Sequence, residues 1–75
     1  MNTRLLTFEL SNDGGELHIH GDESGLRELL RAIERVVATR EHDHLMTPSW
    51  GGTELTEQPQ GEGTKVIHSV VVHPW

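Results

Sequence analysis

The 75-residue sequence contains no cysteine and no long apolar run. Without cysteine, the chain has neither a disulfide framework nor a thiolate metal site. No apolar stretch approaches the roughly 18 residues of a membrane span, and the polar N-terminus does not resemble a signal peptide. We therefore expect a cytoplasmic protein with no membrane partner, whose fold depends on packing alone.

Basic residues are also scarce, with six Lys and Arg against twelve Asp and Glu and a formal net charge of −6 at pH 7. This balance argues against nucleic acid as the main partner. Residues 41–64 carry five acids and no Lys or Arg. Such a segment can steer a basic protein partner toward the molecule. The alternative is that these acids only keep a small protein soluble.

The length of the chain limits its core, because a domain of this size buries only about 60% of the surface that its unfolded form exposes. Little room is left for a concave pocket. We expect a single domain over residues 1–75.

Two segments of alternating polarity, residues 4–10 and 16–20, flank a Ser-Asn-Asp-Gly-Gly linker. An Asp-Gly step between alternating runs is a strong hairpin signal. In the second strand, Leu17 and Ile19 are expected to face the core, and the two histidines between and after them to face outward.

A helix is predicted over residues 23–39. Gly21 breaks the preceding strand, and Asp22 or Ser24 can cap the helix that follows. Apolar residues then recur at steps of three and four: Leu26, Leu29, Leu30, Ile33, Val36 and Val37. This stripe must cover the inward face of a sheet.

The second half of the chain alternates between strands and loops. Residues 42–46 indicate a short strand, and Pro and Gly residues mark a loop over 47–52. Residues 57–63 contain Pro and Gly but no apolar residue, which predicts a flexible loop. Residues 64–73 are rich in β-branched residues and predict the longest strand, with apolar groups on both faces.

This order of elements predicts an α+β fold. We expect a two-layer sandwich in the order β-hairpin, helix, strand, strand, with one helix packed on a mainly antiparallel four-stranded sheet. Nothing in the chain is expected to cover the sheet face away from the helix, so that face is either solvated or an interface.

Histidine pairs raise the possibility of a metal site. His18 and His20 are two apart on a predicted strand, so their rings project from one side at roughly 6.5–7 Å, and His42 and His44 repeat the arrangement. Imidazoles at such positions can bind zinc, nickel or copper. The alternatives are a solvated sheet face, or an imidazole that anchors the neighbouring loop by a hydrogen bond. We expect no resident cofactor, and adventitious zinc or nickel binding in vitro.

No motif indicates catalysis. Ser49 lies in no Gly-x-Ser-x-Gly elbow, and acids occupy the turn before the helix, where a phosphate loop would receive an anion. We expect no catalytic residues and no enzyme.

Trp50 stands between Pro-Ser and Gly-Gly pairs. Two interpretations are open. The indole either plugs an open end of the core or forms an exposed anchor of the kind that dominates binding energy at interfaces.

The segment HDHLMTPSWGGTEL, residues 42–55, resembles the signature of immunity protein family thirty-two of bacterial polymorphic toxin systems. The similarity extends to Gly21-Asp22, to the Gly25-Leu26 pair of the helix and to the closing Val/Ile strand. Members are small proteins encoded beside a secreted toxin, whose toxic domain they neutralise. The resemblance implies a non-catalytic, bacterial immunity protein whose partner is a cognate toxin domain. It leaves open whether the protein is a monomer or a homodimer.

The residues expected to bind the partner are His42, His44, Trp50, Glu54 and Glu57. The first three fall in the family's most characteristic block, where they either shape the scaffold or contact the toxin. The two acids belong to the acidic segment, which would match the basic clefts of nuclease toxins. The alternatives are a homodimeric adaptor and a histidine-based metal-binding module. The metal ligands of that module would be His18, His20, His42 and His44.

Overall fold

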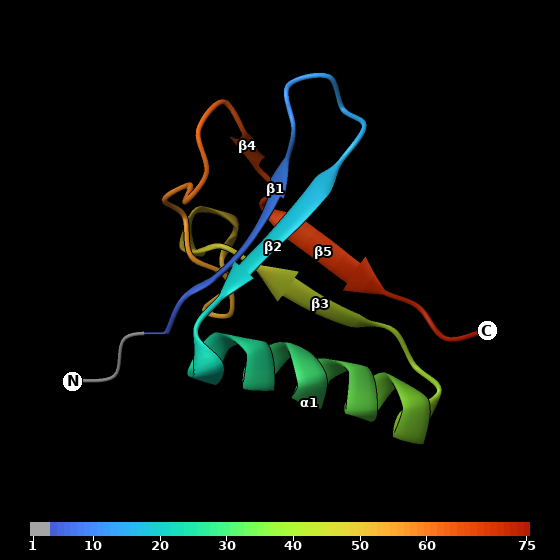
Figure 1. The fold of residues 1–75 in the computed structure, drawn as a ribbon. Helices are drawn as coiled ribbons and strands as arrows, with labels where there is room; N and C mark the ends of the chain where they lie inside the picture. Colours follow the sequence, from blue (N-terminus) through green and yellow to red (C-terminus); the bar gives the residue numbers. More distant parts are fainter. Residues whose placement is uncertain (1–3) are drawn as a thin grey trace.

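The structure, a computed structural model, describes residues 4–75. Its elements are β1 (Leu6–Leu10), β2 (Leu17–Gly21), α1 (Glu23–Thr39), β3 (Asp43–Met46), the 3-10 turn η1 (Pro48–Trp50), β4 (Lys65–Val66) and β5 (Ser69–Val72). Figure 1 shows the β1–β2 hairpin crossing the β3–β5 pair, with α1 running below both. The predicted α+β class, hairpin and helix bounds are confirmed. No helix within residues 4–75 is long and apolar enough to cross a membrane.

Local hydrogen bonds explain where α1 begins and ends. The Asp22 carboxylate accepts a hydrogen bond from the Gly25 N–H at 2.7 Å, as expected of an N-cap. The Asp22 N–H donates to the Leu5 carbonyl at 3.1 Å and so ties the cap to the chain entering β1. At the other end, Arg40 adopts a left-handed conformation with φ 64°, and its N–H donates to the Val36 carbonyl.

The prediction of one four-stranded sheet is wrong, because the strands form a three-stranded sheet in the order β2-β1-β4 and a separate pair β3-β5. The predicted strand over 64–73 bends at Ile67 and His68. The Ile67 N–H donates to the Phe8 carbonyl at 2.7 Å, whereas the His68 carbonyl accepts from the Thr47 N–H at 3.0 Å. Two neighbouring residues therefore bond to different sheets, so β4 continues the first sheet and β5 the second.

The core lies where α1 and the two sheets meet. Its buried cluster is Leu6, Phe8, Ala32, Leu45 and Leu55, and the partly buried hydrophobic residues packed on it are Leu29, Ile67, Val70 and Val72. Most of these residues come from regular elements, but Leu55 comes from the loop after η1 and is only 3% exposed. That loop is therefore part of the packed structure.

The sheet face away from α1 is not open at β1, contrary to expectation. Thr7 and Glu9 point to that side, and both are fully buried. The loop before β4 covers them, because the N–H groups of Gln60 and Gly61 donate to the Glu9 carboxylate at 2.8 and 3.0 Å. The predicted flexibility of residues 57–63 stays a prediction.

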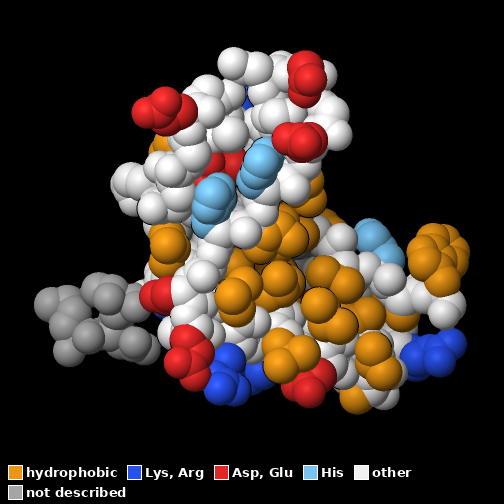
Figure 2. Space-filling view, in the orientation of Figure 1, with side chains coloured by type: hydrophobic (Ala, Val, Ile, Leu, Met, Phe, Trp, Pro, Cys, Tyr) orange, Lys and Arg blue, Asp and Glu red, His pale blue; other side chains and the backbone are white. Residues whose placement is uncertain are grey.

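The prediction that Leu17 and Ile19 face a covered core is also wrong. They share the α1 side of the sheet with buried Phe8, yet their exposed fractions are 56% and 46%. Helix α1 does not reach over them, and one row of its own apolar side chains is left uncovered. We call this surface the β2–α1 face. Its members are Leu17, Ile19, Leu26, Leu30, Ile33 and Val37, and Figure 2 shows hydrophobic side chains gathered over β2 and α1.

Candidate partner-binding surface

Three histidines lie together beside the β3–β5 ladder. Antiparallel pairing of Asp43 with Val72 brings His42 next to His73. The His42 ring centroid is 5.6 Å from that of His73 and 4.9 Å from that of His44. All three are exposed, so this histidine cluster offers adjacent groups that donate and accept hydrogen bonds. Sequence reasoning missed His73, because nothing local fixes the register between β3 and β5.

Trp50 lies outside the core and is 60% exposed. Its indole stacks on the His68 ring with centroids 6.0 Å apart and planes 2° from parallel. His68 is fixed in turn, because its Nδ1 lies 2.8 Å from the hydroxyl of buried Thr47. The loop is thus anchored by an imidazole, but by His68 and not by one of the four histidines considered from the sequence. The indole is therefore not a plug of the core, and its role as an anchor for a partner stays a prediction.

Glu54 and Glu57 brace the loop over residues 47–52, which we call the Trp50 loop, the first at the end of β3 and the second at Ser49. The Glu54 carboxylate accepts from the Met46 N–H at 3.0 Å, and the Glu57 carboxylate accepts from the Ser49 N–H at 2.9 Å. Both side chains are only partly exposed. Each carboxylate uses one oxygen in these contacts, so the loop is braced while the contact of these acids with a partner stays a prediction.

The glycines after Trp50 meet two different steric demands. Gly51 has φ 91°, a left-handed conformation that side chains disfavour. A Cβ on Gly52 would collide with the Met46 carbonyl oxygen and approach its Cβ to 2.7 Å. The Trp-Gly-Gly sequence therefore lets the chain turn sharply and pass against the end of β3.

The acidic segment predicted over residues 41–64 is less available to a partner than its composition suggests. Beside Glu54 and Glu57, Asp43 pairs with Arg35 of α1 at 2.9 Å. Three of its five acids thus have hydrogen-bonding or ionic partners within the chain. Acids of this segment therefore hold the fold together as well as contributing to its surface charge.

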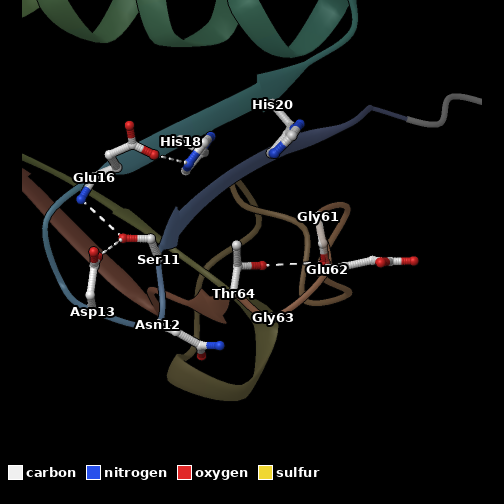
Figure 3. A pocket seen from close by; sticks show the side chains of 10 residues that line it. All are labelled: Ser11, Asn12, Asp13, Glu16, His18, His20, Gly61, Glu62, Gly63 and Thr64. Carbon is white, nitrogen blue, oxygen red and sulfur yellow. Dashed lines mark hydrogen bonds and ion pairs between the residues drawn. The ribbon is translucent and has the colours of Figure 1, made fainter.

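His18 and His20 line an open cavity of about 470 Å³ at the other end of the molecule, between the β1–β2 turn and residues 61–64. Figure 3 shows the His18 ring beside Glu16, whose carboxylate lies 3.2 Å from His18 Nε2, and the His20 ring farther along the strand. The two ring centroids are 6.2 Å apart. The four histidines considered as metal ligands remain as separate pairs on β2 and at β3. Within residues 4–75, no three His, Asp or Glu side chains form a group that could hold a metal ion.

Buried Glu9 holds one wall of this cavity, because Gly61 and Thr64 of that wall donate hydrogen bonds to its carboxylate. Its carboxylate accepts hydrogen bonds from the hydroxyls of Thr7 and Thr64, in addition to the two loop N–H groups. Burial alone would raise the pKa of Glu9, but these four donors favour the ionised form and lower its pKa to about 2. Sequence alternation placed Glu9 on a strand but gave no sign that it is buried.

The match with known proteins covers this surface. The model of the family described as Immunity protein 32 matches residues 16–70, from the start of β2 into β5. Comparison with curated proteins and with solved structures gives no match. The matched region contains the Trp50 loop with its bracing acids and all of the histidine cluster except His73. The chain belongs to the Immunity protein 32 family.

Proposed function

We propose that this protein neutralises a cognate toxin domain by forming a stoichiometric, non-catalytic complex with it. Membership of the immunity family supports the toxin-neutralising role. The observation that carries the choice of surface is the exposed indole of Trp50, held on a braced loop within the family's matched region.

The Trp50 loop is suited to binding because it is already ordered. Stacking on His68 and the backbone hydrogen bonds that the Glu54 and Glu57 carboxylates accept restrict the loop before any partner binds. A preordered aromatic side chain loses little conformational entropy on binding. Tryptophan is also among the residues most enriched at binding hot spots.

The histidine cluster extends the same surface. His42 and Trp50 lie at opposite ends of β3, a strand of four residues that spans about 13 Å. Both therefore fit within a standard interface of about 800 Å² per partner. In this arrangement His42 and His44 supply polar contacts beside the aromatic anchor, and the free oxygens of Glu54 and Glu57 face basic groups of the toxin.

The test is calorimetric titration of the full chain with the toxin domain encoded beside its gene. We expect one-to-one binding that EDTA does not change and that Trp50→Ala weakens at least about 100-fold. Trp75→Ala is the matched control, because Trp75 is fully exposed but lies outside the family match. We expect it to leave the affinity unchanged.

Each part of the proposal fails on a separate result. If the wild-type chain does not bind the toxin domain, the neutralising role is wrong. If binding is tight but Trp50→Ala has no effect, the surface is wrong. A complex lost in EDTA, with a toxin that holds no metal of its own, would instead support the histidine-based metal module.

A further inference from the structure

We propose that the β2–α1 face binds a second copy of this chain, giving a twofold homodimer in which β2 pairs with β2 and α1 packs antiparallel to α1. Trp50 does not belong to this face, but the face adjoins the surface proposed to bind toxin at the end of α1, where Ile33 and Val37 line a groove together with His73. The histidine cluster itself lies on exposed positions in and beside β3 and β5.

The β2–α1 face exposes enough apolar side chains to indicate an interaction site. Its six aliphatic side chains are between 43% and 70% exposed and are contributed by two adjacent elements. Single exposed aliphatic residues are ordinary, but a contiguous patch marks an interaction site. In Figure 2 the hydrophobic side chains form such a patch over β2 and α1.

Helix α1 carries two parallel apolar rows, and this chain covers only one of them. The covered row is Gly25, Leu29, Ala32 and Val36, and the exposed row is Leu26, Leu30, Ile33 and Val37. Each residue of the exposed row follows one of the covered row in the sequence, and successive residues are rotated by about 100° around the helix. Together the two rows therefore span about 160° of its circumference. A helix that packs on one side only needs about 100°. The extra width fits a helix that has neighbours on two sides.

Strand β2 offers an unpaired edge beside the exposed row. It is the end strand in the order β2-β1-β4. The backbone bonds Asp22 N–H to Leu5 and Ser11 N–H to Glu16 mark alternate positions as bonded to β1. By this alternation His18 and His20 bond inward, while Leu17, Ile19 and Gly21 direct their N–H and C=O groups outward. Residues 17–21 contain no Lys, Pro or bulge of the kind that protects open edges.

The face is complementary to itself. In an antiparallel pair of α1 helices, Leu26 of one copy lies opposite Val37 of the other, and Leu30 lies opposite Ile33. The twofold axis also places the charged residues beside the exposed row of one helix next to the same residues of the other. Arg27 of one copy then lies near Glu34 of the second copy. Within residues 4–75, Arg27 pairs only with exposed Glu23, and Glu34 has no ion pair. The charges beside the apolar row therefore fit a second copy.

The small core is a further reason to choose a copy over another protein. Among residues 4–75, six hydrophobic side chains are buried, and chains of this size often gain stability from oligomerisation. A standard interface of about 800 Å² per partner is about 15% of the 5188 Å² surface of this chain. A second copy is present whenever the protein is, whereas a toxin would leave the face exposed until it arrived.

The first test is sedimentation equilibrium of the full chain from about 1 to about 100 µM. We expect a dimer with twice the 8.4 kDa mass of one chain, and we expect this dimer to dissociate on dilution. Leu30→Glu places a charge in the exposed row and should raise the dissociation constant at least about 100-fold. Thr39→Glu is the matched control, since it adds the same charge at an exposed position about 180° around α1 from Leu30 and should leave the dimer intact.

A second test does not depend on a disruptive variant. Because the chain has no cysteine, Ile19→Cys introduces a single thiol at the position that the twofold axis brings near its equivalent. Oxidation should link two chains covalently, and Thr53→Cys, at an exposed loop position, should form no covalent link although its chains still associate. A monomer across the whole concentration range, with no link through Ile19→Cys, overturns the proposal. If Leu30→Glu then loses affinity for the toxin, the face belongs to the toxin. Trp50→Ala should dimerise normally, which separates this proposal from the one above.

Discussion

Replacing Glu9 with glutamine should destabilise the protein by about 3–5 kcal/mol at pH 7. The buried carboxylate accepts four hydrogen bonds, two from threonine hydroxyls and two from backbone N–H groups. A hydrogen bond to a charged group contributes about 1.5–3 kcal/mol. Glutamine keeps one acceptor oxygen but turns an NH₂ group toward two of the donors, so about two of the four bonds are lost.

The same carboxylate predicts how stability depends on pH. Hydrogen bonding outweighs burial and lowers the pKa of Glu9 from 4.5 to about 2 in the folded protein. Because the unfolded chain binds this proton first, the stabilisation is fully present above about pH 4.5 and is lost as the pH falls toward 2. The difference between the two pKa values corresponds to at most about 3 kcal/mol.

Urea denaturation followed by circular dichroism would measure both effects, between pH 7 and about pH 3. Protein concentration must be fixed, because the stability of a dimer depends on it. Glu9→Gln should lower the urea midpoint at pH 7, and its difference from wild type should shrink below pH 4.5. Glu62→Gln, at an exposed position lining the same cavity, should behave as wild type. A pH-independent difference, or equal midpoints at pH 7, would refute the assignment of Glu9 as the buried anion that holds this loop.

Three further substitutions test the scaffold by thermal denaturation. Asp22→Ala removes the hydrogen bond to the Gly25 N–H and should destabilise α1 by about 1 kcal/mol, with Asp22→Asn restoring most of it; equal losses in both variants would contradict the capping role. Leu55→Ala empties a buried position and should destabilise by about 2–5 kcal/mol, and a loss below about 1 kcal/mol would show that the loop is not part of the core. Gly52→Ala forces a Cβ against the Met46 carbonyl and should destabilise by about 1–3 kcal/mol; an unchanged melting temperature would contradict the close approach of the loop to β3.

The parts of the fold that sequence reasoning predicted depend on short-range physics. The Asp-Gly step and the alternation on both sides of it specify the β1–β2 hairpin. The cap at Asp22 and the apolar spacing specify α1 over Glu23–Thr39. In each case the residues that determine the element lie within it or beside it.

The division into two sheets could not be predicted, because it depends on contacts distant in the chain. β-branched residues continue through the bend at Ile67 and His68, so local propensity gives no signal there. The bend arises because Phe8 and Thr47 bond to adjacent residues from different sides. Those partners lie 59 and 21 residues away in sequence. Register between distant strands, which also brings His73 beside His42, is likewise absent from local patterns.

Hydrophobic periodicity has a related limit, which explains the error at Leu17 and Ile19. Alternation identifies which side chains share a face, and it placed these two correctly on the side of Phe8. It does not tell which element covers that face or how far the cover extends. In α1, likewise, the sequence pattern merges a buried row and an exposed row into one apolar stripe. Only the packed structure separates residues of the core from residues of an interface.

The fate of the acids alters the expected chemistry of toxin recognition. Glu9, Glu54, Glu57 and Asp43 all accept hydrogen bonds or ion pairs from within the chain. Negative charge is thus used to hold loops to strands, and it is partly screened from a partner by the groups that it binds. Within residues 42–55, the groups left to contact a partner are the indole of Trp50 and the imidazoles of His42 and His44. Charge then contributes mainly to the rate of encounter, and the lifetime of the complex depends on how well the toxin encloses Trp50.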